Sequence, residues 1–337
     1  MIKVLDCTLR DGGYMNHWAY GADVARGIIS GVAAAGVEYI EIGFLCNEKR
    51  EESTTIYTSV AEAERLLPPV CAAEMILLMI EFGHYDISRV PERAEGGVDA
   101  IRLIFKKNEI QDALEYAAQL KRKGYRVFVN PISVTSYSDE EMLELVDKVN
   151  RLRPYAFSIV DTYGLMHQES SLHYFHLLDE HLHAEITIGA HFHNNFQMAY
   201  ANCVALARAP RKHDLILDAS CYGMGKRAGN ACTELLCHYL NEHAGKHYDM
   251  ATLLELIESY MLEIHRATPW GYNVHYYLAA HAKVHPNYVS FMENRRGLPI
   301  RAQMDILSRI PEAYRLTYSE ELIRELCAEY SATESHE

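Results

Sequence analysis

The segment His191-Phe192-His193 is the first feature of the sequence that could do chemistry. It follows residues 186–190, an apolar and β-branched run that predicts a buried strand. Because residues i and i+2 of a strand point to the same side, His191 and His193 would present two imidazoles together. Two imidazoles on one face can chelate a metal ion. The plainer interpretation is two hydrogen-bonded or exposed histidines in a chain that has 18 of them.

A charged pair, Arg10-Asp11, follows the first apolar run of the chain and precedes Gly12-Gly13. Asp11 offers a carboxylate for a cation, and Arg10 offers a guanidinium for an anion. A surface ion pair before a glycine turn is the alternative. Together with two histidines, Asp11 would make an open, three-ligand site that suits Mn²⁺, Mg²⁺, Co²⁺, Fe²⁺ or Zn²⁺ and leaves positions for substrate oxygens.

A glycine-rich segment, Gly223–Asn230, is the third candidate. Glycine lets the backbone approach a ligand closely, and a turn that enters a helix can hold an anion on free amides. The spacing is not that of a phosphate-binding P-loop. A flexible connection with a helix cap at Asn230 is the alternative.

The elements between these segments must bring them together. Short β-branched runs alternate with longer runs of helical spacing, among them residues 21–35, 56–67 and 110–122. Eight alternating strands favour a (β/α)8 barrel, the TIM barrel, which places its site at the carboxyl ends of the strands. A doubly wound sheet would usually carry a G-x-G-x-x-G turn after the first strand, and this chain does not. The predicted strands are 4–9, 39–44, 74–80, 100–105, 125–132, 156–161, 186–192 and 215–220.

The strand pattern stops near residue 233, and only helical periodicity follows. We therefore expect an α/β chain in two parts, a (β/α)8 catalytic domain over residues 1–235 and a helical C-terminal extension over residues 236–337. The aromatic-rich segment 269–278 predicts that the extension docks on the barrel or on a second subunit. We expect a homodimer or a larger homo-oligomer.

Composition excludes several classes of protein. The chain has 337 residues, 49% of them hydrophobic and 23% charged, which is typical of a globular protein and not of a disordered one. A formal charge of −14 argues against a surface that neutralises nucleic-acid phosphates. No apolar run approaches the roughly 20 residues that cross a bilayer, and the N-terminus has no signal-peptide core. The 8 cysteines form no C-x-x-C pair, so we expect reduced thiols and a cytoplasmic protein without nucleic-acid or membrane partners.

Four segments together resemble the metal-dependent family of TIM barrels related to 3-hydroxy-3-methylglutaryl-CoA lyase, the DRE-TIM metallolyases. The family includes isopropylmalate and homocitrate synthases and 4-hydroxy-2-oxovalerate aldolases. The resemblance runs in order from residue 1 to about residue 235. A later block, Pro269–Asn273 with His285–Tyr288, looks like a bacterial subfamily often named after 4-hydroxy-2-oxovalerate aldolase. The four segments are Asp6–Gly12, Asp161–Gly164, His191–Asn195 with Ala201-Asn202, and Gly223–Asn230 with Glu234.

The resemblance implies that Asp11, His191 and His193 bind a divalent metal ion, with Asn230 as a further ligand. Mn²⁺ or Mg²⁺ is the expected ion, and Zn²⁺ or Co²⁺ is the alternative. It also implies that Arg10 stabilises the enolate left when a carbon–carbon bond breaks, because a fixed guanidinium opposes oxyanion charge. If the first strand continued through residue 11, the two neighbouring side chains would face opposite ways, so the turn must begin early.

The histidine that acts as catalytic base in the oxovalerate aldolases is replaced in this chain. In the oxovalerate aldolases a histidine three residues after the metal-binding aspartate acts as base, but this chain has Tyr14 there and His17 three residues later. A tyrosine with a pKa of about 10 is a poor base near neutral pH, so His17 is the better candidate on chemistry alone. Tyr272 is a candidate proton donor from the tail, although packing is the plainer role for any one of 23 tyrosines.

Four more polar residues occupy predicted strands or their ends. Glu41 alternates with isoleucines, and as an internal carboxylate it needs a partner such as Arg10. Arg102 could bind a substrate carboxylate through two parallel hydrogen bonds. Asn130 and Thr162 could supply further polar contacts. For all four, structural hydrogen bonding is the alternative.

These patterns predict a metal-dependent carbon–carbon lyase, an aldolase. Its partner would be a small 4-hydroxy-2-oxo acid that is cleaved into a pyruvate enolate and an aldehyde, or formed from them. A first alternative is a Claisen-type acyltransferase that uses acetyl-CoA, because Gly225–Asn230 is close to the G-E-R-A-G-N of isopropylmalate synthases. A second alternative is a non-catalytic barrel that serves as a binding partner.

Overall fold

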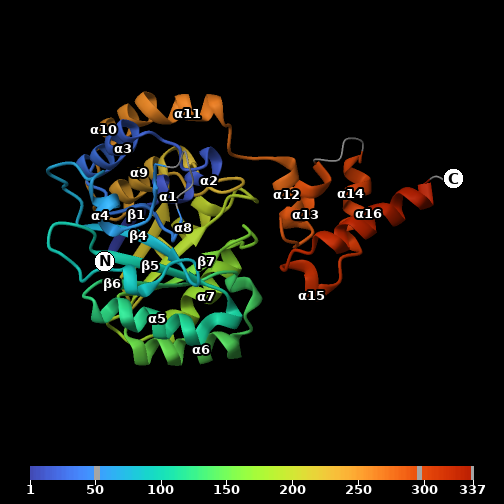
Figure 1. Ribbon diagram of the computed structural model, residues 1–337, viewed down its shortest axis with the longest axis horizontal. Coiled ribbons are helices and arrows are strands. Elements are labelled where there is room, and N and C mark those ends of the chain that lie inside the picture. Colours follow the sequence, from blue (N-terminus) through green and yellow to red (C-terminus); the bar gives the residue numbers. More distant parts are fainter. Residues whose placement is uncertain (49–53, 294–297, 335–337) are drawn as a thin grey trace.

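A closed barrel of parallel strands forms the centre of the computed structural model, which describes residues 1–48, 54–293 and 298–334 (Figure 1). Eight of the strands follow one another around the barrel, and the first pairs with both the second and the last. The TIM barrel is therefore confirmed. A short strand, β3 (Ile56–Tyr57), pairs with the end of β2 and is not one of the eight barrel strands. The barrel strands are β1 (Ile2–Asp6), β2 (Tyr39–Leu45), β4 (Met75–Glu81), β5 (Ala100–Phe105), β6 (Arg126–Pro131), β7 (Ala156–Asp161), β8 (Thr187–Phe192) and β9 (Leu215–Ala219).

The strands read as nearly continuous apolar runs because both of their faces are buried. Every residue of β2, β7 and β9 is buried. The inward side chains fill the barrel below its mouth with an apolar layer that includes Leu5, Tyr39, Met75 and Phe128. The outward side chains pack against the surrounding helices in one large cluster.

The helices around the barrel mostly lie where helical spacing predicts them. The helix predicted over residues 56–67 covers only Val60–Glu64. Ile56 and Tyr57 pair with β2, and the helix begins only after Ser59, which accepts a hydrogen bond from the amide of Glu62. The connection after β4 contains only a short 3₁₀ turn, Ile87–Arg89. The helices are α3 (Ala22–Ala34), α4 (Val60–Glu64), α5 (Ile110–Arg122), α6 (Asp139–Leu152), α7 (Gln168–His181), α8 (Ala199–Arg208) and α9 (Thr233–His243).

The first strand ends earlier than its apolar pattern predicts. It stops at Asp6, and residues Thr8–Asp11 form a helical turn, α1, followed by a second turn, α2 (Gly13–Asn16). The carboxylate of Asp6 accepts a hydrogen bond from the amide of Thr8 at 3.0 Å, which turns the chain out of the strand. Two further amides, those of Arg10 and Asp11, donate to the carbonyl of Cys7.

Apart from the connections between them, the described residues after α9 are helical, as predicted, and pack in two groups. Helices α10 (Met250–Leu256) and α11 (Leu262–Ala267), joined by the π-helical turn Ile257–Met261, belong to the hydrophobic cluster of the barrel. A second cluster begins at Leu278 and reaches Cys327. It holds together what we call the C-terminal lobe, residues 274–293 and 298–334. The lobe comprises α12 (Val274–His281), α13 (Asn287–Glu293), α14 (Ile300–Ser308), α15 (Glu312–Arg315) and α16 (Glu320–Glu334).

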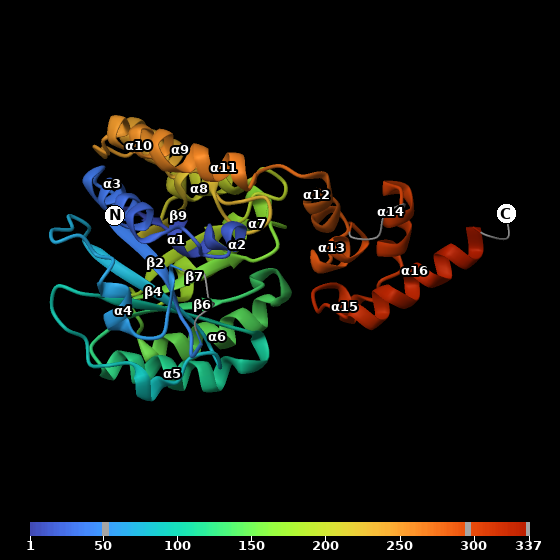
Figure 2. The same ribbon diagram turned by 45° about the horizontal axis from the view of Figure 1, so that its top comes forward.

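Figures 1 and 2 show the C-terminal lobe beside the barrel, reached through an extended segment after α11. Its contacts with the barrel lie near the carboxyl ends of the strands. Tyr163, after β7, donates a hydrogen bond to the carbonyl of Leu316 at 3.2 Å, and Asn195, after β8, donates to the carbonyl of Tyr276 at 3.3 Å. The predicted division of the chain at residue 235 stays a prediction. Among the described residues, no helix is both long and apolar enough to span a membrane.

Candidate active site

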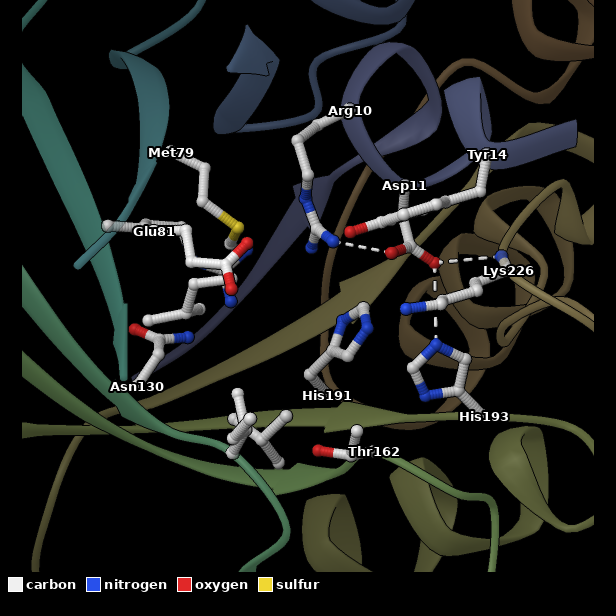
Figure 3. A pocket seen from close by; sticks show the side chains of 14 residues that line it. Arg10, Asp11, Tyr14, Met79, Glu81, Asn130, Thr162, His191, His193 and Lys226 are labelled. Atoms are coloured by element: carbon white, nitrogen blue, oxygen red, sulfur yellow. Dashed lines mark hydrogen bonds and ion pairs between the residues drawn. The ribbon is translucent and has the colours of Figure 1, made fainter. Parts of the chain in front are cut away.

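Asp11, His191 and His193 meet at the carboxyl end of the barrel (Figure 3). One ligand atom from each of the three lies within 4.8 Å of the others, and all three residues are buried. The histidines stand at the end of β8 and directly after it. Asp11 comes from the helical turn α1, which places Arg10 and Asp11 on the same side of the chain, as a strand through residue 11 could not.

Hydrogen bonds orient both imidazoles. His191 donates from Nδ1 to the Asp218 carboxylate at 3.0 Å, and His193 donates from Nδ1 to the carbonyl of Asp161 at 2.9 Å. Since these partners only accept, the Nε2 atoms keep their lone pairs, which is the form that ligates a metal. Nε2 of His193 is buried without a hydrogen-bond partner, although it lies 3.5 Å from an Asp11 oxygen.

Asn230 completes this side of the site. Its Nδ2 donates to Asp11 at 2.9 Å, while its Oδ1 is buried and has no partner. The glycine-rich segment reaches the end of β8 because the amide of Asn194 donates to the carbonyl of Gly229. Two buried acceptors without partners, His193 Nε2 and Asn230 Oδ1, beside a buried carboxylate form a donor set that fits a divalent metal ion.

The electrostatics favour the protonation states of Asp11 and His191 that a metal ion requires. Burial alone would raise the pKa of Asp11, but the ion pair with the Arg10 guanidinium opposes burial, and that pKa lies well below its usual range. Burial lowers the pKa of His191 in spite of its bond to Asp218, so the imidazole is neutral at neutral pH. The site therefore presents one carboxylate and neutral imidazole.

A network of buried ion pairs supports these groups from below. Arg10 donates from Nε to Glu41 at 2.6 Å and from Nη1 to Asp11. Arg102 donates from Nη1 to the same Glu41 oxygen at 3.1 Å and from Nη2 to Asp218. Glu41 is thus the partner of both guanidinium groups, and it holds them in place without lining the pocket. Buried charges that lose a partner are costly, so the network fixes Arg10 and, through Asp218, His191.

A cavity of about 120 Å³ opens above these residues. It brings together most of the side chains that the sequence singled out. Apolar walls come from Met79, Ile104, Ile132 and Val160. The predicted residues that line it are Arg10, Asp11, Tyr14, Arg102, Asn130, Thr162, His191 and His193.

Two predicted catalytic residues lie outside this cavity. His17 ends α2 in a left-handed conformation (φ 57°) with an exposed side chain, because the next residue, Trp18, turns inward and donates to the carbonyl of Arg10 at 2.8 Å. Tyr272 is 63% exposed on the segment before the C-terminal lobe. Tyr14 does line the cavity; burial, with Asp11 nearby, raises the pKa of its hydroxyl, which stays protonated at neutral pH.

Three charged residues of the site were not foreseen. Glu81 and Lys226 line the cavity, and Asp218 orients His191. Burial, reinforced by Arg227, lowers the pKa of Lys226 to about 8. The available signals were weak: a lone aspartate inside the apolar run of β9, and a lysine where the synthase motif G-E-R-A-G-N has glutamate.

Known proteins resemble a large part of the chain. The family model described as HMGL-like matches residues 1–259. The 4-hydroxy-2-oxovalerate aldolase of Moorella thermoacetica is 25% identical over 245 residues, which cover 72% of this chain and 70% of that protein. The oxaloacetate decarboxylase of Mycobacterium tuberculosis is 24% identical over 241 residues, which cover 69% of this chain and 68% of that protein.

Solved structures share the fold. The N-terminal domain of a candidate aldolase from Bacteroides vulgatus superposes with a TM-score of 0.75 at 23% identity and covers 90% of this chain and 99% of that one. The HMG-CoA lyase of Bacillus subtilis superposes with a TM-score of 0.63 at 16% identity and covers 79% of this chain and 95% of that one. At these identities the likeness supports the barrel architecture alone.

Proposed function

The chain belongs to the HMGL-like family, and we propose that it is a divalent-metal-dependent aldolase that cleaves or forms a carbon–carbon bond of a 4-hydroxy-2-oxo acid. That it is a carbon–carbon lyase rests on the family and on its aldolase and lyase relatives. The class of acid that it cleaves or forms is our proposal. The observation that carries it is the convergence of Asp11, His191 and His193 with the Arg10 guanidinium on one cavity.

Asp11, His191 and His193 would hold the metal ion, with Asn230 beside them as a fourth ligand. A bound divalent ion supplies Lewis-acid polarisation of the substrate's 2-oxo group. Mn²⁺ or Mg²⁺ suits the carboxylate and amide oxygens, and Zn²⁺ or Co²⁺ suits the imidazoles.

Arg10 would stabilise the negative charge that develops on the enolate oxygen as the bond between C3 and C4 breaks. Its guanidinium is already fixed by Glu41 and Asp11, so it does not need to reorganise during the reaction. Asn130 and Thr162 line the same cavity and would orient the substrate. Arg102 donates from Nη1 to Glu41 and from Nη2 to Asp218, so we assign it chiefly to positioning.

Tyr14 would move a proton. Because its hydroxyl is protonated at neutral pH, it fits donation to the enolate carbon better than the first abstraction from the 4-hydroxyl. His17 and Tyr272 stay predictions, and a change of the exposed loop conformation would be needed to bring either of them to the cavity.

The test combines elemental analysis with a screen for pyruvate release from 4-hydroxy-2-oxo acids of increasing length. We expect about one divalent ion per chain and pyruvate release from at least one acid. Asp11→Asn should lose both, because the amide neither carries charge nor keeps the buried pair with Arg10. Asp139→Asn removes a carboxylate from an exposed pair with His173 and is the matched control. Intact metal content and turnover in Asp11→Asn would refute the proposal.

The Claisen-type alternative is tested in the same preparation. Release of free thiol from acetyl-CoA in the presence of a 2-oxo acid would favour it. A protein that carries no metal ion and whose melting is insensitive to chelator would favour the non-catalytic alternative. The homo-oligomeric state and the cytoplasmic location stay predictions, and light scattering of the purified protein would test the first.

A further inference from the structure

Lys226 lines the cavity and Arg227 follows it in the chain, and no carboxylate among the described residues forms an ion pair with either. Arg227 is only 7% exposed. Its Nη1 donates to the carbonyl of Thr162 at 2.8 Å, and its guanidinium lies 5.3 Å from the ring centre of Tyr163. The Lys226 ammonium lies 4.3 Å from the ring centre of Tyr14. A neutral carbonyl and two aromatic rings thus take the place of counter-ions.

The other two cations of the cavity differ in this respect. Arg10 pairs with Asp11 and Glu41, and Arg102 pairs with Glu41 and Asp218. Those three carboxylates are therefore already shared within the network. Asp11 touches Lys226 only through the backbone, where the amide of Lys226 donates to it at 3.2 Å.

Glu81 is the remaining carboxylate that lines the cavity. Figure 3 shows it on the opposite side from Lys226, and its Oε2 lies 3.3 Å from Nδ1 of His84. Its side chain is 38% exposed, so its charge is largely screened by water. Glu81 therefore attracts the Lys226 ammonium only from a distance and forms no ion pair with it.

The backbone holds the two cations where they are. Arg227 has a left-handed conformation (φ 65°), and Gly229 (φ 82°) approaches the carbonyl of Gly223 so closely that a Cβ would lie 2.2 Å from it. The loop is closed by hydrogen bonds from Gly229 to Lys226 and from Asn230 to Gly223. A strained, hydrogen-bonded loop that presents unpaired charge is preorganised for a ligand of opposite charge.

We propose that Lys226 and Arg227 bind a second acidic group of the substrate, a carboxylate or a phosphate on the part that leaves as the aldehyde. Lys226 contacts this group directly, and Arg227 adds positive potential behind it. The inference rests on the proposed function and narrows its substrate class to 2-oxo acids with an anionic distal end. Arg227 is buried and Lys226 is partly buried. A charge without a counter-ion is costly there, and an incoming anion relieves that cost.

The cavity that Lys226 lines adjoins a larger one. A second cavity, of about 650 Å³, lies between the barrel and the C-terminal lobe, and Ile132 lines both cavities. Tyr163, whose ring lies 5.3 Å from the Arg227 guanidinium, lines the second cavity. The lobe contributes His285, Thr317 and Tyr318 to its wall.

The test compares ligands of equal length that differ in the distal group. Isothermal titration of the Mn²⁺-loaded protein measures 2-oxopentanoate, 2-oxoglutarate and 2-oxo-4-phosphonobutanoate. We expect at least one of the two acidic ligands to bind about tenfold more tightly than 2-oxopentanoate, as one charge-assisted contact predicts. The tighter of the two shows which group, carboxylate or phosphate, the site accepts.

Variants decide whether Lys226 causes the preference. Lys226→Met should abolish it, Lys226→Arg should keep most of it, and Lys148→Met, which removes an equal charge from the outer helix α6, should leave it unchanged. Glu81→Gln should increase the preference for the acidic ligands by about threefold, because it removes a negative charge that competes with the ligand for Lys226.

Binding of 2-oxopentanoate without any preference for the acidic ligands, or a preference that survives in Lys226→Met, overturns the anion site and leaves the proposed aldolase standing. Failure of every 2-oxo acid to bind overturns both.

Discussion

Two buried histidine–aspartate pairs lie at opposite ends of the barrel, and their hydrogen-bond geometry is nearly the same. At the carboxyl end, His191 donates to Asp218 at 3.0 Å, and at the amino end His213, just before β9, donates to Asp179 at 2.9 Å. Both histidines are at most 5% exposed. Nothing in the pairs themselves distinguishes a candidate metal ligand from a structural brace.

The surroundings make the difference. His191 faces a second imidazole and a carboxylate, Asp11, which gather within ligand distance. Asp179 instead also accepts hydrogen bonds from the amides of Lys212 and His213, at 2.9 Å and 3.1 Å, and so ties the end of α7 to the start of β9. Within the described ranges, no comparable cluster of metal-binding groups surrounds His213. Chemistry at this barrel depends on convergence at one end, not on the pair.

The largest expected difference between the two pairs follows from replacing their histidines. His191→Ala should lose most of the bound metal and lower pyruvate release by about 10²–10³-fold or more. The variant lacks a metal ligand and, with the metal ion, the charge that would stabilise the enolate. His213→Ala should keep metal and turnover but lower the free energy of unfolding by about 1–3 kcal/mol, because Asp179 stays buried with one partner fewer. Elemental analysis, turnover and urea unfolding measure the three quantities. Equal loss of metal in the two variants would contradict the comparison.

A smaller effect, on Mn²⁺ affinity, is expected when the aspartate of each pair is replaced. Asp218→Asn should weaken Mn²⁺ binding by about 10–100-fold, because Asp218 fixes the tautomer and the orientation of His191 and holds Arg102. Asp179→Asn is the matched control at the other end and should leave Mn²⁺ affinity unchanged. Titration of the metal-free proteins with Mn²⁺ measures both. If the two variants bind Mn²⁺ alike, Asp218 does not position His191.

The smallest effect is a pH dependence at the amino end. Burial would raise the pKa of Asp179, but its bonds to His213 and to two backbone amides outweigh burial and lower it. A carboxyl whose pKa is lower in the folded than in the unfolded state stabilises the fold above its unfolded pKa of about 4, and that contribution is lost as the pH falls through the folded pKa. We expect Asp179→Asn to remove about 1 kcal/mol of this acid-dependent stability.

Urea unfolding of the wild type and of Asp179→Asn between pH 6 and pH 3 measures this contribution. The free energy of unfolding should fall less steeply with acid in the variant. Parallel curves would show that Asp179 carries no such stabilisation.

Most of the barrel could be predicted from local pattern. The runs 100–105 and 156–161 are strands at the predicted residues, and 110–122 is a helix at the predicted residues. Periodicity succeeds there because each segment buries a face or both faces against its neighbours. It failed at residues 7–9, where the apolar pattern continues but the Asp6 carboxylate captures the amide of Thr8 and turns the chain.

The candidate site was predictable only in part. Asp11, His191 and His193 stand out because their types and spacing match a metal-binding family at strand ends. Lys226 and Asp218 do not stand out in the sequence. Their roles depend on which buried side chains have a hydrogen-bond or ion-pair partner and which have none. Pairing of that kind joins residues as far apart as Arg102 and Asp218, and no local pattern records it.

By itself the sequence determined the order of strands and helices, the barrel that they close and the residue types that stand at its mouth. The tertiary structure decided which of these side chains share a cavity, which end of the barrel gathers ligands, and which cations stay unpaired. The physical reason is that hydrophobic periodicity is encoded over a few neighbouring residues, whereas the energy of a buried charge depends on every group within several ångströms, whatever its distance along the chain.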